Sequence, residues 1–454
     1  MGPRAFAERI CRQLRGAGYQ AFFVGGCVRD ILLEREPADY DVCTDATPDQ
    51  VLRIFPRSLA VGAKFGVVIV VEDLPVDSSV GGAAAPIQVE VATFRSDIGY
   101  SDGRHPDSVV LAKSPQEDVK RRDFTINALL MNPETNDILD FVGGREDLRA
   151  GIIRAIGDPE ERFREDKLRM VRAVRFAARL DYIIEPKTFH AIQKLAPEVI
   201  QVSPERLRDE LTKLLTEGAA RRAFELLDET KLLRQLLPEI ARMKGVEQPP
   251  QFHPEGNVWI HTLLMLEKLP AGCSPTLAWG VLLHDVGKPA TFSPPSGPDG
   301  RIRFDRHAEV GTRMAEEICR RLRFSNDDTE QIASLVASHM KFKDVLQMKP
   351  ATLKRFARLN RFDEHLELHR LDCLSSHRML ENYDFVRRFT EVTPAEEIRP
   401  PRLVTGDDLL AIGLRPGPLF KEILNAVEEA QLNDSIRTRE EALTLAKSLI
   451  PTGS

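Results

Sequence analysis

The sequence predicts an α+β protein in which a small mixed sheet with helices forms the N-terminal part and helices form the remainder. Two observations carry this prediction. Short apolar runs rich in β-branched residues, typical of strands, occur up to Phe94. From Asp158 onward, apolar residues recur at helical spacing with few helix breakers. At 454 residues the chain is too long for one ordinary domain, so several are expected.

The first part of the chain alternates helical and extended segments. Apolar runs with strand composition occur at residues 21–24, 67–71 and 89–94. Apolar residues at helical spacing occur at residues 6–14 and 28–33. Gly25-Gly26 separates the first strand from the second helix, so the order there is strand, glycine turn, helix. The low-complexity stretch 77–86 predicts a loop between the two later strands.

The helical remainder divides at proline-rich stretches. Residues 248–251 (Gln-Pro-Pro-Gln) indicate a boundary, and Pro400-Pro401 opens a short C-terminal segment. Residues 294–298 are also proline-rich, and we expect them to form a loop inside the third part. The predicted domains are residues 1–150, 151–247, 248–398 and 399–454.

Composition excludes several classes of protein. Hydrophobic residues make up 42% of the chain and charged residues 29%, and no apolar stretch approaches the roughly 18–20 residues of a membrane helix. We therefore expect a cytoplasmic protein with no membrane partner. The six cysteines lack Cys-x-x-Cys spacing, which favours free thiols in a reducing compartment. Because the net charge is −6, any surface that binds nucleic acid must be local.

A pair of carboxylates follows the glycine turn. Asp39 and Asp41 are alternate residues, so on an extended strand their side chains project to the same face. Such carboxylates repel each other unless a cation lies between them, and Mg²⁺ held by two carboxylates and substrate phosphates is usual for nucleotidyl transfer. Glu90, on a later strand, is a third candidate. The structural alternatives are a solvated turn for the pair and an exposed strand face for Glu90.

The glycine turn predicts a phosphate site beside these carboxylates. Gly25 and Gly26 leave backbone N–H groups uncovered near the start of a helix, where anions bind. Arg29 lies one turn further along the helix and can pair with phosphate oxygens.

Residues 165–172 are helical by propensity and carry an acceptor near a donor. Asp166 and Arg169 are three residues apart, so we expect both side chains on one helix face. Cytosine and adenine each present an amino donor beside a ring-nitrogen acceptor, which fits a carboxylate beside a guanidinium. Uracil and guanine are mismatched, at a cost on the order of 1–3 kcal/mol for each mismatch. The alternative is an ordinary surface ion pair.

The run Gly-Gly-Cys-Val-Arg-Asp at residues 25–30, followed by Asp39-Tyr40-Asp41, resembles the signature of the class II tRNA nucleotidyltransferase and bacterial poly(A) polymerase family. This family belongs to the polymerase-β-like nucleotidyltransferase superfamily. The resemblance implies a polymerase-β-like head in which Asp39 and Asp41 hold Mg²⁺. It also implies that Glu90 helps to activate the 3′ hydroxyl of an RNA, and that residues 151–247 form a helical neck that binds nucleotide and RNA.

The resemblance extends to residues that would contact the nucleotide. Residues 121–128 match the family's ribose- and phosphate-recognition motif, although a capped helix with a solvated charged edge is the structural alternative. Asp166 and Arg169 would read the incoming base, and residues 203–210 match the motif that braces their helix. The implied nucleotide-binding residues are Gly25, Gly26, Arg29, Arg122, Asp123, Asn127, Asp166, Arg169, Arg172 and Arg175.

Residues 95–106 are polar and resemble the flexible loop of CCA-adding and A-adding members of the family. That loop is absent from CC-adding members, so the resemblance argues against CC addition alone. Arg104-His105-Pro106 departs from the Arg-Arg-Pro that the family often shows, which weakens the case for adenosine addition.

A second group of metal-ligating residue types lies in the helical half. His284-Asp285 follows an apolar run, so this pair is expected to end a buried helix. The set resembles that of HD phosphohydrolase domains, which implies a second divalent-metal site whose metal the sequence does not identify. The alternative is a helical domain that supports RNA without turnover. The candidate ligands are His261, His284, Asp285, His307, His339 and Asp372.

Three functions remain open at this point. The first is template-independent addition of CCA to the 3′ end of tRNA from CTP and ATP, with possible phosphohydrolase activity in the HD part. The second is addition of A alone, or of poly(A), by the same site. The third is an HD phosphohydrolase whose head senses nucleotides. The sequence leaves the oligomeric state open.

Overall fold

The computed structural model describes residues 2–60, 66–72, 86–98, 108–112, 114–251, 253–296 and 300–450. The chain forms two compact units, Met1–Ala241 and Arg242–Ser454. The division into four domains therefore stays a prediction. Among the described residues, no helix combines the length and apolar character needed to cross a membrane.

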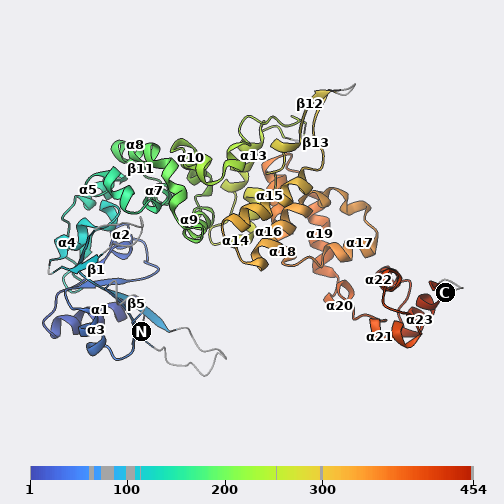
Figure 1. Cartoon of the computed structure of the whole chain (residues 1–454), viewed down its shortest axis with the longest axis horizontal. Coiled ribbons are helices and arrows are strands. Elements are labelled where there is room, and N and C mark those ends of the chain that lie inside the picture. Colours follow the sequence, from blue (N-terminus) through green and yellow to red (C-terminus); the bar gives the residue numbers. More distant parts are fainter. Residues whose placement is uncertain are drawn as a thin grey trace. The chain divides into compact units, whose positions relative to one another are not determined.

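The first unit is built on a seven-stranded mixed sheet (Figure 1). Its strands, in spatial order, are β3 (Ser58–Leu59), β4 (Val67–Glu72), β5 (Ile87–Thr93), β2 (Asp41–Thr44), β1 (Ala21–Val24), β8 (Leu130–Met131) and β9 (Ile138–Leu139). Neighbouring strands are antiparallel, except that β2 and β5 run parallel. The three strands expected from the sequence are present within two residues of their predicted bounds.

Helices cover this sheet because each strand is apolar on at least one face. The helix α1 (Pro3–Gly16) buries Phe6, Ile10 and Leu14 and packs against β1, β2 and β5. On the opposite face, α4 (Pro115–Lys120) contributes Val119 to an apolar cluster with side chains of β1 and β2. The helix α2 (Gly26–Leu32) follows β1 directly, as the strand–glycine turn–helix pattern predicted.

Residues 144–241 of the first unit are mainly helical, with one short pair of strands. The helices are α5 (Gly144–Ala150), α6 (Pro159–Glu165), α7 (Leu168–Leu180), α8 (Pro186–Leu195), α9 (Pro204–Thr216), α10 (Ala220–Glu229), α11 (Leu232–Leu236) and α12 (Pro238–Ala241). The strands β10 (Ile152–Ile153) and β11 (Ile183–Ile184) pair in parallel. The expectation of an all-helical neck is therefore corrected by this two-stranded element.

The second unit is also mainly helical. Its helices include α13 (Val258–Glu267), α14 (Pro275–Leu283), α15 (His307–Arg321), α16 (Asn326–Ser338), η5 (His339–Gln347), α17 (Pro350–Phe356), α18 (Phe362–Ser375), α19 (Glu381–Val392) and α20 (Ala395–Ile398). The proline-rich stretch expected as a loop, residues 294–298, overlaps β12 (Phe292–Ser296), which pairs with β13 (Arg301–Phe304). The register shifts between Ser293 and Ser296, because the two prolines between them have no N–H to donate.

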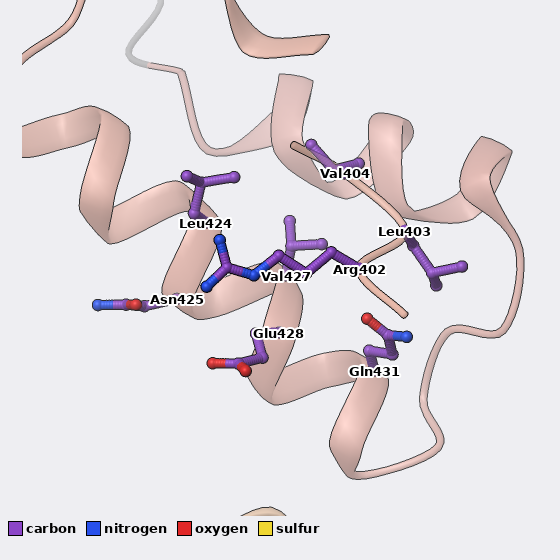
Figure 2. Close-up of a pocket in the computed structure, with 8 residues that line it drawn as sticks. All are labelled: Arg402, Leu403, Val404, Leu424, Asn425, Val427, Glu428 and Gln431. Atoms are coloured by element: carbon purple, nitrogen blue, oxygen red, sulfur yellow. The ribbon is translucent and has the colours of Figure 1, made fainter. Parts of the chain in front are cut away.

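The chain ends in three helices, α21 (Gly406–Ala411), α22 (Pro418–Leu432) and α23 (Arg439–Ser448), which share an apolar cluster. A small hollow of about 30 Å³ lies beside α22. Figure 2 shows the Arg402 side chain extending across it toward Leu424 and Val427. This volume is sufficient for only about one water molecule.

Candidate functional site

Three carboxylates gather where β2 and β5 run side by side. Asp41 is the first residue of β2, and Glu90 is its partner across the parallel pairing. Asp39 is exposed and precedes the strand, so the strand is shorter than the extended run that we expected. Tyr40, between the two aspartates, is 2% exposed and packs against Phe23.

The three carboxylates affect one another electrostatically. Burial, followed by the charges of Asp39 and Glu90, raises the pKa of Asp41 to about 7, while the Arg122 guanidinium opposes this shift. A divalent cation would neutralise the repulsion, and carboxylate oxygens are the ligands that Mg²⁺ prefers. The set of carboxylates therefore fits Mg²⁺.

Arg122 reaches this site because a buried acid holds it. Asp118, on α4, is 1% exposed and accepts hydrogen bonds from Arg121 at 2.9 Å and from Arg122 at 3.0 Å. These contacts outweigh burial and lower the pKa of Asp118. Asp118 was not among the predicted site residues, although an acid three and four residues before two arginines on a helix is a usable signal.

The glycine turn lies next to Arg122. Gly25 has a φ of 80°, in the region that favours glycine. A Cβ atom there would lie 3.6 Å from Nη1 of Arg122 and 3.8 Å from the carbonyl oxygen of Asn127. Arg29, one turn into α2, is 4% exposed and donates hydrogen bonds of 2.8 Å to Oδ1 of Asp30 and Oδ1 of Asn127.

The expected ribose- and phosphate-binding residues form one hydrogen-bonded chain. Asn127, in the short helix η2 (Thr125–Asn127), donates to Oδ1 of Asp123 at 3.3 Å. Arg172, on α7, donates to Oδ2 of Asp123 through Nε at 3.0 Å and Nη2 at 2.7 Å. Together with the Arg29 contact to Asn127, this network joins α2, η2 and α7.

The region predicted to be one helix through residues 165–172 is broken. The helix α6 ends at Glu165, Asp166 is extended with φ −144°, and α7 begins at Leu168. The break is stabilised locally, because Oδ1 of Asp166 accepts the N–H of Leu168 at 3.1 Å. The expectation that Asp166 and Arg169 share the face of a continuous helix is therefore wrong.

These two side chains also have separate partners. Asp166 accepts hydrogen bonds from Arg206 at 3.1 Å and 2.7 Å. Arg169 donates to Glu165 at 2.8 Å and to the carbonyl oxygen of Arg121 at 2.9 Å. Their role in reading the base stays a prediction.

The helix α9 braces this region. Besides Arg206, it supplies Glu210, which accepts a 2.6 Å hydrogen bond from Nε of Arg175. No side-chain hydrogen bond caps α9 at its N-cap residue Ser203.

Two expected loops lie partly outside the described residues. Residues 77–85 are outside, so only Pro86 of that loop is described. Of residues 95–106, the segment Arg95–Ile98 forms β6, which pairs with β7 (Ser108–Leu111), and residues 99–106 lie outside.

Comparison with known proteins agrees with this geometry. Residues 21–154 match the family described as "Poly A polymerase head domain", and residues 181–244 match "Probable RNA and SrmB-binding site of polymerase A". Residues 307–446 match a "tRNA nucleotidyltransferase domain 2" family. Residues 21–154 thus carry the head domain of the poly(A) polymerase family.

Similar proteins include a CCA-adding enzyme of Geobacillus stearothermophilus, 47% identical over 53% of this chain and 56% of the relative. One of Lactobacillus helveticus is 41% identical over 58% of this chain and 64% of the relative. The matched region thus spans roughly half to two thirds of these curated relatives. The crystal structure of a Bacillus stearothermophilus CCA-adding enzyme in complex with CTP superposes with a TM-score of 0.72 at 29% identity, covering 99% of this chain and 98% of that one.

The second unit contains the expected cluster of histidines and aspartates. Its members come from the ends or interiors of five helices and are His261 (α13), His284 and Asp285 (after α14), His307 (α15), His339 (η5) and Asp372 (α18). The structure therefore brings together residues that are more than a hundred positions apart in the sequence.

Each imidazole in the cluster is held by a contact of its Nδ1 atom, the ring nitrogen that points away from the centre of the cluster. Nδ1 of His284, His307 and His339 lies 2.8 Å, 2.9 Å and 2.7 Å from the carbonyl oxygen three residues earlier. Nδ1 of His261 lies 2.7 Å from Oε1 of Glu255. This arrangement fixes Nδ1 as the protonated nitrogen and leaves Nε2 as a metal ligand.

The Nε2 atoms face Asp285. His284 Nε2 lies 3.2 Å from one carboxylate oxygen, and those of His307 and His339 lie 3.7 Å and 3.9 Å from the other. His284 Nε2 is buried and has no hydrogen-bond partner among the described residues. Burial, reinforced by the neighbouring histidine His284, lowers the pKa of His339 to about 3, which keeps that imidazole neutral.

His261 and Asp372 form the other end of the cluster. Nε2 of His261 lies 3.2 Å from Oδ1 of Asp372. Burial opposes the charged imidazole, but the two carboxylates of Asp372 and Glu255 raise the pKa of His261 to about 9. A bound metal ion would have to displace the extra proton of His261; with that proton gone, imidazoles and carboxylates suit divalent transition metals, so the cluster fits one or two such ions.

The cluster opens into a cavity of about 1010 Å³. Lys288 lies at its wall, with Nζ 2.7 Å from Oδ2 of Asp285 and 2.6 Å from Oε1 of Gln248. Lys288 and Glu255 were not among the predicted site residues. Lys288 had an available signal, because it lies three residues after the candidate ligand Asp285. The role of Glu255 becomes evident only in the folded chain.

Proposed function

We propose that this chain adds CCA to the 3′ end of tRNA without a template, using CTP and ATP. The observation that carries the proposal is the pairing of Asp41 with Glu90 beside Asp39 and the glycine turn. Relatives named CCA-adding enzymes support it. The cysteines in the described residues are free thiols, as in a reducing compartment, and we place the reaction in the cytoplasm.

In this reaction the 3′ oxygen of the RNA forms a bond to the α-phosphorus of the nucleotide. The bond from that phosphorus to the bridging oxygen breaks, and pyrophosphate leaves. Asp39 and Asp41 would hold Mg²⁺, which when bound withdraws charge from the phosphates and favours ionisation of the hydroxyl. Glu90 is exposed and positioned to accept the hydroxyl proton.

Binding of the nucleotide falls to residues around the same site. Arg122 and the N–H groups of Gly25 and Gly26 would contact the triphosphate. Asp123 and Asn127 would contact the ribose. We assign base selection to Asp166 and Arg169, which must then exchange or share their present partners Arg206 and Glu165 when a base binds.

The test is a nucleotide-addition assay with tRNA that lacks its CCA end. We expect incorporation of C, C and A, with the product ends read by sequencing. Asp41→Asn should lower the rate at least about 1000-fold, since it removes a metal ligand. Asp49→Asn, an exposed acid at the start of α3 (Pro48–Ile54), should leave the rate unchanged.

The same assay separates the alternative within the family. Repeated incorporation from ATP alone would identify a poly(A) polymerase, and a single A added only to tRNA ending in CC would identify an A-adding enzyme. Either outcome would overturn addition of the full CCA.

The histidine cluster supports a second activity, hydrolysis of a phosphate ester in the second unit. One bound ion would activate water as the nucleophile, and Lys288 would bind a phosphate oxygen. Asp285→Asn should abolish metal-dependent hydrolysis of bis(p-nitrophenyl) phosphate, whereas Asp363→Asn, exposed on α18, should not. If Asp285→Asn abolished nucleotide addition while Asp39→Ala did not, the head would be a nucleotide sensor instead.

A further inference from the structure

Three arginine side chains converge on one aromatic ring in the first unit. Phe176, on α7, is 5% exposed. The centroid of its ring lies 4.7 Å, 5.2 Å and 5.4 Å from the guanidinium carbons of Arg175, Arg172 and Arg29. Phe124 packs edge-on against the same ring, with the two centroids 5.9 Å apart.

Each guanidinium is also hydrogen-bonded along its edge. Arg29 donates to Asn127 and Arg172 donates to Asp123, so both take part in the chain of residues proposed to bind the ribose and phosphates. Such hydrogen bonds fix the edge of a guanidinium, whereas an aromatic ring acts on its face. The two kinds of contact together determine how the planar group is oriented.

The Phe176 ring also offsets the electrostatic repulsion between the arginines around it. Arg29 is 4% exposed and Arg175 is 7% exposed, so little water screens the repulsion between cations at this point. The negative face of an aromatic ring attracts a cation, and more strongly where water is excluded. An aliphatic side chain of similar size would separate the arginines without attracting them.

We propose that Phe176 is a positioning residue for nucleotide binding. Its ring holds Arg29 and Arg172 in the orientation in which they meet the incoming triphosphate and ribose. The assignment rests on the nucleotide-transfer function proposed above. Phe176 acts through the arginines, so its loss weakens nucleotide binding more than it slows the chemical step.

The test compares two substitutions at this position with a matched buried phenylalanine. Phe176→Leu is expected to raise KM for both CTP and ATP about tenfold, equivalent to about 1.4 kcal/mol, with kcat within about threefold of the parent. Phe176→Tyr keeps the ring and should restore KM to within about twofold. Phe163, on α6, is fully buried, and no arginine of the described residues lies over its ring. Phe163→Leu should lower the melting temperature without changing KM.

Three outcomes would overturn the proposal: an unchanged KM in Phe176→Leu, a rise of similar size in Phe163→Leu, or no recovery in Phe176→Tyr. If Phe176→Leu does not fold, Phe176→Met, whose unbranched side chain adapts to irregular gaps in a core, replaces it. CTP binding measured by calorimetry keeps the test independent of turnover. If the parent protein bound CTP but added nothing to tRNA, the proposed function would fail while the role of Phe176 could still be measured.

Discussion

Arg206 holds both carboxylate oxygens of Asp166, at 3.1 Å and 2.7 Å, across forty residues of sequence. The contact fixes an acid that lies in the break between α6 and α7, where no helix constrains it. Arg206 therefore sets the direction in which Asp166 presents its acceptors, and substituting it tests whether that direction matters.

Arg206→Ala is expected to lower kcat/KM for CTP and ATP about tenfold and to weaken rejection of UTP and GTP, because Asp166 loses its fixed orientation. Incorporation of each nucleotide measured separately checks this. Arg208→Ala, two residues later on the same helix, removes a pair with the adjacent Asp209 and serves as the control. Equal effects from both substitutions would contradict a role for Arg206 in selection.

The raised pKa of Asp41 predicts a pH-dependent stability in the absence of metal. The folded pKa of about 7 lies above the ordinary value of 3.8, so the folded protein binds the proton more tightly than the unfolded chain. The resulting stabilisation is complete below pH 3.8 and is lost as the pH rises through 7. This contribution to the free energy of unfolding is at most about 4 kcal/mol.

Denaturant titrations at several pH values, compared between the parent protein and Asp41→Asn, isolate this contribution. In EDTA, the difference in the free energy of unfolding between the two proteins should change between pH 4 and pH 7. In saturating Mg²⁺ this difference should vary less with pH. A difference that does not vary with pH would show that the carboxylates are not coupled as described.

The pair Arg175–Glu210 predicts a large loss of stability. Its two side chains are 9% and 4% exposed, and their closest atoms are 2.6 Å apart. Glu210→Ala is expected to cost about 2–4 kcal/mol, because it leaves a buried guanidinium with Glu217 as its one remaining carboxylate partner among the described residues. Glu225→Ala breaks the half-exposed pair with Arg221 and should cost less than about 1 kcal/mol. Unfolding in urea measures both.

The histidine cluster predicts stabilisation by transition metals. At 100 times its dissociation constant, an ion bound only by the folded protein adds about 2.7 kcal/mol. Scanning calorimetry with Mn²⁺, Ni²⁺ or Zn²⁺ should show a higher transition temperature for the second unit, reversed by EDTA. His284→Ala should remove this effect, and His190→Ala, exposed on α8, should preserve it. Identical responses from both variants would exclude the cluster as the binding site.

The predictable parts of the molecule were those encoded locally. The glycine turn at Gly25, the strand that follows it at Asp41 and the buried pair His284-Asp285 each depend on residues adjacent in sequence. The break at Asp166 and the strand β12 were not predictable, because helical propensity and proline content mislead where a side-chain cap or a hairpin partner decides. Phe176 meets Arg29 and Phe124 through tertiary contacts, which a single sequence does not display.

The backward-facing hydrogen bonds of the four imidazoles have a practical consequence. Because backbone carbonyls and Glu255 supply the anchors, the rings keep their places without depending on any ion. Metal binding should thus be reversible and should not require refolding. Protein from which the metal has been removed should recover all of its metal on dialysis against the ion.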